Sequence, residues 1–371
     1  MTASPALPRA GRLDCLCEPG ALGEGAADRG GVALLAVGFA LSVLSQVLSL
    51  SILPLAGLAF APSRSLAMLP YAAFYAGAAL ASLPASLLLD SFGRRAAFSL
   101  GASLGAAGGL VLVWALVRLH FGALALGAFW LGTASGFSLF YRHAAAPLGA
   151  RGRSALPLVF GAATLAALAA PTIATAAEAL ASPRVFVGMA IAAALAHVGS
   201  LTATSALPYG RIRAAESRAE GPQDWRRILP PTIIGALAWF GMTGLMGATP
   251  VAMVGCGLSG AVASAVAWHV MAMYAPSLAL ACLPGGPRPI PMAAAGIALL
   301  AAGTLAFALS RQAEGFSLAA ALVGVGWSLA TLGTTLWVHR DGQPSRWLLG
   351  LHDGALLGAA LLGALAANAF A

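Results

Sequence analysis

The sequence contains no lysine and few charged residues of any kind. Only 9% of its 371 residues are charged, whereas 60% are hydrophobic and 45 are glycine. Soluble globular chains carry about 25% charged residues, so this composition excludes an ordinary soluble domain. Apolar runs that are too long for buried core helices indicate a chain that crosses a membrane repeatedly.

Motifs of the common enzyme classes are also missing. The sequence shows no catalytic triad, phosphate-binding glycine loop or nucleotide motif, which argues against an enzyme and against a pump driven by nucleotide hydrolysis. The four cysteines, at 15, 17, 256 and 282, do not suggest a disulfide scaffold. Residues 1–30 are polar and lack the apolar core of a cleavable signal peptide.

Eleven apolar segments have the length of a membrane-spanning helix, which needs about 20 residues. The fold class predicted is therefore all-α and integral to the membrane. The expected spans are 31–56, 66–89, 96–118, 120–141, 154–178, 184–207, 230–255, 258–283, 290–309, 315–338 and 347–371.

The arginines are distributed unevenly between the two sides that these spans define. With the N-terminus in the cytoplasm, 16 of the 20 arginines fall on the cytoplasmic side and four on the outside. This bias is typical of multi-pass proteins of the bacterial inner membrane. The net charge of +8 then mostly reflects the membrane topology. The expected partner is the lipid bilayer, and no nucleic-acid partner is expected.

The longest polar connection between spans divides the chain into two halves. It covers residues 208–229 and contains five arginines. The expected organisation is a cytoplasmic N-terminal tail, a six-helix bundle, a cytoplasmic central loop and a C-terminal helical bundle, at 1–30, 31–207, 208–229 and 230–371.

A short segment between the second and third spans combines a carboxylate, a glycine and two arginines: Asp90, Gly93, Arg94 and Arg95. It resembles the signature loop of the major facilitator superfamily, although Ser86 stands where the family pattern has glycine. The resemblance implies two bundles that rock around a midplane site, with these four residues in conformational gating. The family is expected to have twelve spans, so an eleven-span chain would leave one side of the second bundle open.

Two pairs of soft side chains lie near the middle of the seventh and eighth spans. Met242 and Met246 are four residues apart, as are His269 and Met273, so each pair lies on one face of its helix. At about 1.5 Å per residue, both pairs fall near the bilayer centre. Thioether sulfur and imidazole favour Cu(I) over hard cations. The sequence therefore predicts a metal site made by these four residues.

This pattern resembles the CcoA-type copper importers of the superfamily, particularly over Trp268–Ser277. The resemblance implies copper import into the cytoplasm in support of cytochrome oxidase assembly, with copper as transported substrate and no permanently bound cofactor. A cytoplasmic copper chaperone is a possible partner. Cys15, Cys17 and Cys256 are possible further copper ligands.

Three alternatives remain open at the sequence level. Methionine is common core filler, so the two pairs could simply pack. A relative of the same fold could carry riboflavin or another small organic solute, stacked on Trp130, Phe137, Tyr141, Trp239 or Trp268. The chain could also be a membrane assembly protein that transports nothing. His197, isolated in the sixth span, is interpreted as a packing or gating residue.

Overall fold

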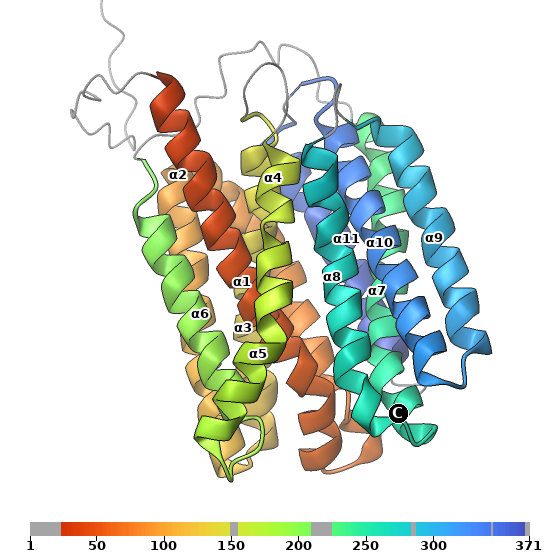
Figure 1. Cartoon of the computed structure of the whole chain (residues 1–371). Helices are drawn as coiled ribbons and strands as arrows, with labels where there is room; N and C mark the ends of the chain where they lie inside the picture. The colour runs from red at the N-terminus through yellow and green to blue at the C-terminus, as the bar shows by residue number, and fades with distance from the viewer. Residues whose placement is uncertain (1–23, 149–154, 209–224, 283–286, 343, 368–371) are drawn as a thin grey trace, which may run out of the picture.

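The computed structural model describes residues 24–148, 155–208, 225–282, 287–342 and 344–367. Every regular element in these ranges is a helix (Figure 1). The elements are α1 (Glu24–Phe60), η1 (Arg64–Leu66), α2 (Leu69–Arg118), α3 (Phe121–Ala145), α4 (Leu156–Gly161), α5 (Ala163–Ala181), α6 (Val187–Ser205), α7 (Trp225–Gly255), η2 (Ser259–Ala261), α8 (Val262–Ala281), α9 (Pro289–Leu309), α10 (Ala313–Val338) and α11 (Arg346–Ala366).

Within the described ranges, 10 helical segments are long and apolar enough to cross a membrane. One of them, α2, contains two crossings, because its backbone leaves the helical conformation at Gly93, where φ is 81°. The chain is therefore a multi-pass integral membrane protein with the eleven predicted spans. The predicted bounds hold within a few residues, except that α1 begins at Glu24 and the fifth span is broken between α4 and α5.

Contacts with α3 show that the two arms of α2 run in opposite directions. Residues of the first arm meet α3 in the same order along both helices, whereas residues of the second arm meet it in reverse order. The close approaches are Gly132 with Phe74 and Gly136 with Ala78 for the first arm, and Gly101 with Phe137 and Gly108 with Leu131 for the second. Small residues at these points let the helix backbones approach closely, so α3 is held between both arms.

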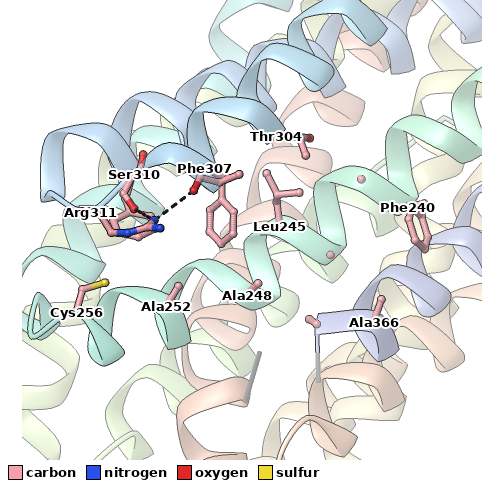
Figure 2. A pocket seen from close by; sticks show the side chains of 15 residues that line it. Phe240, Leu245, Ala248, Ala252, Cys256, Thr304, Phe307, Ser310, Arg311 and Ala366 are labelled. Atoms are coloured by element: carbon pink, nitrogen blue, oxygen red, sulfur yellow. Dashed lines mark hydrogen bonds between the residues drawn. The ribbon is translucent and has the colours of Figure 1, made fainter. Parts of the chain in front are cut away.

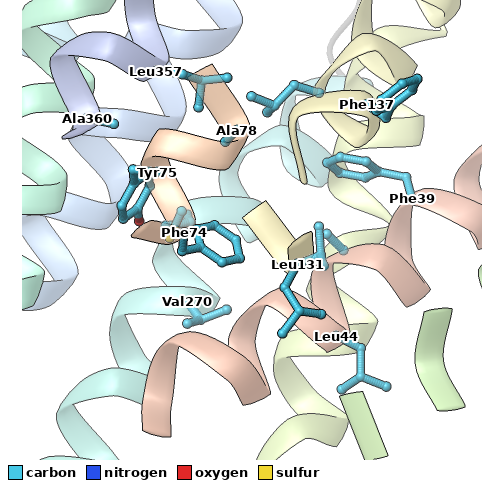
Figure 3. Close-up of a cluster of buried hydrophobic side chains, with 14 of the residues drawn as sticks. Phe39, Leu44, Phe74, Tyr75, Ala78, Leu131, Phe137, Val270, Leu357 and Ala360 are labelled. Carbon is cyan, nitrogen blue, oxygen red and sulfur yellow. The ribbon is translucent and has the colours of Figure 1, made fainter. Parts of the chain in front are cut away.

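The helices before and after the central connection form two halves that touch each other. We call residues 24–208 the first half and residues 225–367 the second half. They meet where α2 packs on α11 and where α4 and α5 pack on α8. One continuous hydrophobic core joins them, and Figure 3 shows Phe39 and Phe74 of the first half in the same cluster as Val270 and Leu357 of the second.

One end of the molecule collects most of the described arginines. Helix α1 begins at this end, at the top of Figure 1. The bend of α2, the end of α3 and the starts of α7, α9 and α11 also lie there, and they carry Arg94, Arg142, Arg226, Arg288 and Arg346. We call it the arginine-rich end and the other the opposite end. Most of the predicted N-terminal tail and central loop lies outside the described residues.

Candidate functional site

A cavity of about 80 Å³ lies between the two halves, and we call it the inter-half cavity. Its walls come from α1, α2, α7 and α8, in the part of each helix toward the opposite end. All four residues of the predicted metal site line it. The principal polar or sulfur-bearing side chains in its wall are Gln46, Ser51, Tyr71, Tyr75, Met242, Met246, His269, Met273 and Tyr274.

The ring of His269 is fixed by a backbone contact. Its Nδ1 lies 2.8 Å from the carbonyl oxygen of Ala320. A carbonyl oxygen only accepts, so Nδ1 carries the proton, and Nε2 of the neutral ring has a free lone pair. His269 is 3% exposed. The site therefore offers one nitrogen that can accept a hydrogen bond or bind a metal.

Met242 and Met273 are buried, and Met246 is half-buried. Among the described residues, no group of three or more His, Cys, Asp or Glu side chains is arranged to hold a metal ion. An ion in the inter-half cavity would therefore depend on methionine sulfur for most of its ligands.

Cys256 does not line this cavity. Cys256 is exposed after the end of α7. It lines a separate cavity of about 500 Å³ between α7, α9 and the end of α11, shown with Phe307 and Arg311 in Figure 2. Cys15 and Cys17 lie outside the described residues. The structure thus separates Cys256 from the four residues of the predicted metal site.

The larger cavity is a poorer candidate for the functional site. Its lining is mostly apolar, with glycine and alanine along α7, and Arg311 donates to the carbonyls of Ala308 and Ser310. It lies within the second half, between α7, α9 and the end of α11. Only the smaller cavity lies between the halves, where relative movement would change its access.

Five aromatic rings from both halves meet beside the inter-half cavity. Trp327 is the centre of this aromatic cluster, with ring centroids of Trp239, Phe160 and Tyr274 at 5.0, 5.8 and 6.0 Å. Phe39 stacks on Phe160 at 5.4 Å. The cluster joins α1 and α4 of the first half to α7, α8 and α10 of the second.

Two donors in the aromatic cluster are left unused. The indole Nε1 atoms of Trp239 and Trp327 are buried and have no hydrogen-bond partner among the described residues. An unsatisfied buried donor costs about 1–3 kcal/mol, which a ligand with acceptor atoms would recover. The sequence pointed to Trp239 but missed Trp327 and Tyr274. Trp130 and Trp268 are 36% and 58% exposed, away from the cluster.

The residues of the signature-like loop lie at the arginine-rich end, next to α11. Asp90 is exposed and interacts electrostatically with Arg346, and the Ser86 hydroxyl donates to the Arg346 carbonyl. Gly93 supplies the positive φ of the bend, and Arg94 and Arg95 are half-buried beside it. The loop therefore touches the second half directly. His197 is buried in the first half, against Gly105 of α2.

A group of buried charged and imidazole side chains joins the halves at the same end. We call Arg142, His143, His339, His352 and Asp353 the charged cluster. Arg142 forms an ion pair with Asp353, and both are almost fully buried. Nε2 of His143 lies 3.2 Å from each carboxylate oxygen of Asp353. This cluster closes the arginine-rich end between α3 and α11.

The sequence alone assigned no role to this cluster. Arg142 and Asp353 are 211 positions apart, so no local pattern could pair them. A signal was present in the adjacent pairs Arg142–His143 and His352–Asp353, because ionisable groups inside spans are rare and functional.

Comparisons with known proteins place the fold. A scan against profiles of known protein families finds no match. The riboflavin transporter RfnT of Brucella anthropi is 27% identical over 332 residues, covering 87% of this chain and 83% of RfnT. The crystal structure of the human organic anion transporter MFSD10 matches with a TM-score of 0.63 at 16% identity, covering 92% of each chain.

A second structural match agrees with the first. The major facilitator superfamily transporter FucP in the outward conformation gives a TM-score of 0.55 at 15% identity, over 90% of this chain and 97% of FucP. All three proteins are named as transporters. The chain therefore has the fold of the major facilitator superfamily.

Proposed function

We propose that this chain is a secondary transporter for a flat organic solute of the riboflavin type, which it moves through the inter-half cavity by alternating access. The observation that carries the proposal is the pair of unused indole donors, on Trp239 and Trp327, inside the aromatic cluster. The sequence similarity to a riboflavin transporter supports the same class of solute.

The chemistry of a flavin ring matches the groups at this site. The ring is flat and can stack on aromatic side chains. Its carbonyl oxygens can accept from Trp239 and Trp327, and its imide N–H can donate to the free Nε2 of His269. A metal ion could use neither indole donor, because an N–H group is not a ligand.

The size of the cavity requires movement of the halves. Sites for molecules of this size usually enclose about 300–1,000 Å³, whereas the inter-half cavity holds about 80 Å³. The charged cluster closes the arginine-rich end. Binding of a flavin therefore requires the halves to separate around the aromatic cluster, which is the movement expected for two bundles of this fold.

The experiment measures riboflavin binding and counterflow in proteoliposomes. Trp327→Phe and Trp239→Phe keep an aromatic ring but remove the donor. Each should weaken binding about 2- to 12-fold, which corresponds to about 0.5–1.5 kcal/mol for one hydrogen bond. Trp268→Phe is the matched control, since Trp268 is 58% exposed. Absence of riboflavin binding and counterflow in the wild type would contradict the proposal.

Copper is the second candidate solute. It is favoured by one observation, that Met242, Met246, His269 and Met273 all line the inter-half cavity. In this case the direction is import, with supply to cytochrome oxidase assembly and a cytoplasmic copper chaperone as acceptor. The cavity of about 80 Å³ accommodates an ion without expansion.

Methionine-to-leucine variants separate the two solutes, because leucine keeps the volume and removes the sulfur. For a copper carrier, Met242→Leu and Met273→Leu should abolish copper uptake by cells. For a flavin carrier, both variants should keep riboflavin counterflow close to the wild-type rate. Met253→Leu is the matched control, since Met253 is buried on α7 outside the cavity.

A further inference from the structure

The charged cluster contains an ordered path of hydrogen bonds from its rim to its centre. Asp353 only accepts, so Nε2 of His143 carries the proton between them. Nδ1 of the neutral His143 ring then accepts, and it lies 2.9 Å from Nε2 of His339. His339 is only half-buried, whereas His143 and Asp353 are buried. The path leads from the arginine-rich end inward to Asp353.

His352 approaches Asp353 with an unprotonated nitrogen. The Thr232 hydroxyl donates to the carbonyl of Ile228 at 2.6 Å, so it accepts from Nδ1 of His352 at 2.7 Å. The proton of His352 is therefore on Nδ1, and Nε2 has a lone pair. That Nε2 lies 3.9 Å from a carboxylate oxygen of Asp353 and has no hydrogen-bond partner among the described residues.

A lone pair beside a carboxylate oxygen is a place for one proton. Without that proton, two acceptors face each other: Nε2 of His352 and a carboxylate oxygen of Asp353. With the proton, His352 becomes a cation that faces the carboxylate from 3.9 Å. Once Nε2 moves within hydrogen-bond distance, it can donate a charge-assisted hydrogen bond, which is about twice as strong as a neutral one. The site therefore binds a proton by its geometry.

Loading that proton changes which half satisfies Asp353. In the structure, Asp353 is paired with Arg142 and His143 of α3, across the two halves. His352 belongs to α11, the same helix as Asp353. A protonated His352 would satisfy the carboxylate within the second half and weaken its attraction to the first.

The charge balance favours the same outcome. With neutral imidazoles, the charges of Arg142 and Asp353 cancel. One added proton leaves a net positive charge in a buried site, and the remaining charged groups nearby are Arg346 and, beyond it, Asp90. Burying an uncompensated charge is costly, and separation of the halves at the arginine-rich end would relieve this cost by admitting water.

We propose that His352 and Asp353 form a proton-binding site, reached through His339 and His143, and that its loading opens the arginine-rich end. The step takes one proton from a hydronium ion of the solvent and ends with one new N–H bond at Nε2 of His352. Each N–H bond that breaks in His339 and His143 along the path is re-formed with the proton that follows, so the net change is one O–H bond broken and one N–H bond formed. Coupling of this opening to solute movement rests on the proposed transport function, whereas the opening itself does not.

The first experiment follows opening without any solute. Ser86 is buried against α11, so Ser86→Cys, with the four natural cysteines replaced by serine, reacts with a charged thiol reagent only when the halves separate. Rates are divided by those of Pro147→Cys, an exposed position after α3, to correct for thiol ionisation. The corrected rate should rise with acidity, by at most about tenfold per pH unit for one proton.

Variants of the cluster identify the group that takes up the proton. His352→Asn cannot be protonated at this position, so its corrected rate should rise less steeply with acidity than that of the wild type, whereas the control His120→Gln, at an exposed site, should behave as wild type. Asp353→Asn should weaken the dependence in the same way, with Asp341→Asn as its exposed control. A pH-independent rate in the wild type, or unchanged dependence in His352→Asn, would overturn the proposal.

The second experiment tests coupling in proteoliposomes. His352→Asn should keep riboflavin counterflow, which needs no gradient, but lose accumulation driven by a pH gradient. Wild-type accumulation that persists in His352→Asn would overturn the coupling. Absence of counterflow in the wild type would instead contradict the proposed solute and leave the thiol-labelling result to decide the proton site.

Discussion

At the scale of single residues, His339 is the group through which the charged cluster meets the solvent. Burial, and then electrostatic interaction with His143 and Arg346, holds the pKa of His339 well below its usual value of 6.5. The closed state therefore binds fewer protons than any state in which His339 is in water. The stability of the closed state is present above pH 6.5 and is lost as the pH falls below it.

Hydrogen exchange measured by mass spectrometry provides the test for His339. Between pH 7.5 and 5.5, after correction for intrinsic exchange rates, the amides at the end of α3 and the start of α11 should lose protection. In His339→Gln this loss should be smaller. Equal protection at both pH values in the wild type would be inconsistent with the low pKa of His339.

The ion pair between Arg142 and Asp353 gives a second prediction at this scale. Removing one partner of a buried pair costs about 3–5 kcal/mol, because the other charge is left uncompensated, whereas replacing both with apolar residues is often neutral. Arg142→Met should therefore lower the thermal unfolding temperature in detergent, and Arg142→Met with Asp353→Leu should recover most of it. A double variant that is less stable than Arg142→Met would show that the pair itself stabilises the fold.

Local spacing explains which site residues could be predicted. The methionine pair and the His269–Met273 pair are each one helical turn apart, so a single helix brings each pair to one face. The unused donors of Trp239 and Trp327 and the pairing of Arg142 with Asp353 depend on contacts between helices distant in sequence. No periodic pattern in a single segment contains that information.

At the scale of helices, the contact between α2 and α3 depends on the absence of side chains. A Cβ added at Gly132 would lie 1.7 Å from the carbonyl oxygen of Phe74. Gly132→Ala should therefore push the first arm of α2 away from α3 and lower the thermal unfolding temperature by several degrees. Gly358→Ala on α11, where a Cβ meets nothing within 4 Å, is the control and should be neutral or slightly stabilising.

The spans themselves were predictable because their length is set by the bilayer rather than by tertiary packing. The break between α4 and α5 and the early start of α1 at Glu24 were not. The sequence stays apolar across the break, and the residues before position 31 are polar but compatible with a helix. Hydropathy alone therefore does not mark either helix boundary. The positive φ at Gly93 was indicated by the glycine turn between two apolar runs.

At the scale of the whole molecule, a disulfide across the halves should stop transport. The Cβ that Gly350 would carry lies 3.2 Å from Cβ of Ser86, close to the 3.5–4.5 Å of disulfides. Oxidised Ser86→Cys/Gly350→Cys, without the natural cysteines, should lose riboflavin counterflow and regain it after reduction. Each single variant, oxidised in the same way, should keep its activity; counterflow through the cross-linked protein would exclude opening at the arginine-rich end.

The two arms of α2 determine how the halves can part. Both arms contact α3 closely, through backbone atoms at Gly108, Gly132 and Gly136, so we expect α3 to move with α2 as one body rather than to bend toward α11. Arg142, near the end of α3, would then not follow Asp353 when α11 moves away with the second half. We therefore expect the ion pair to be either formed or broken, with few partly open intermediates between the closed and the open state.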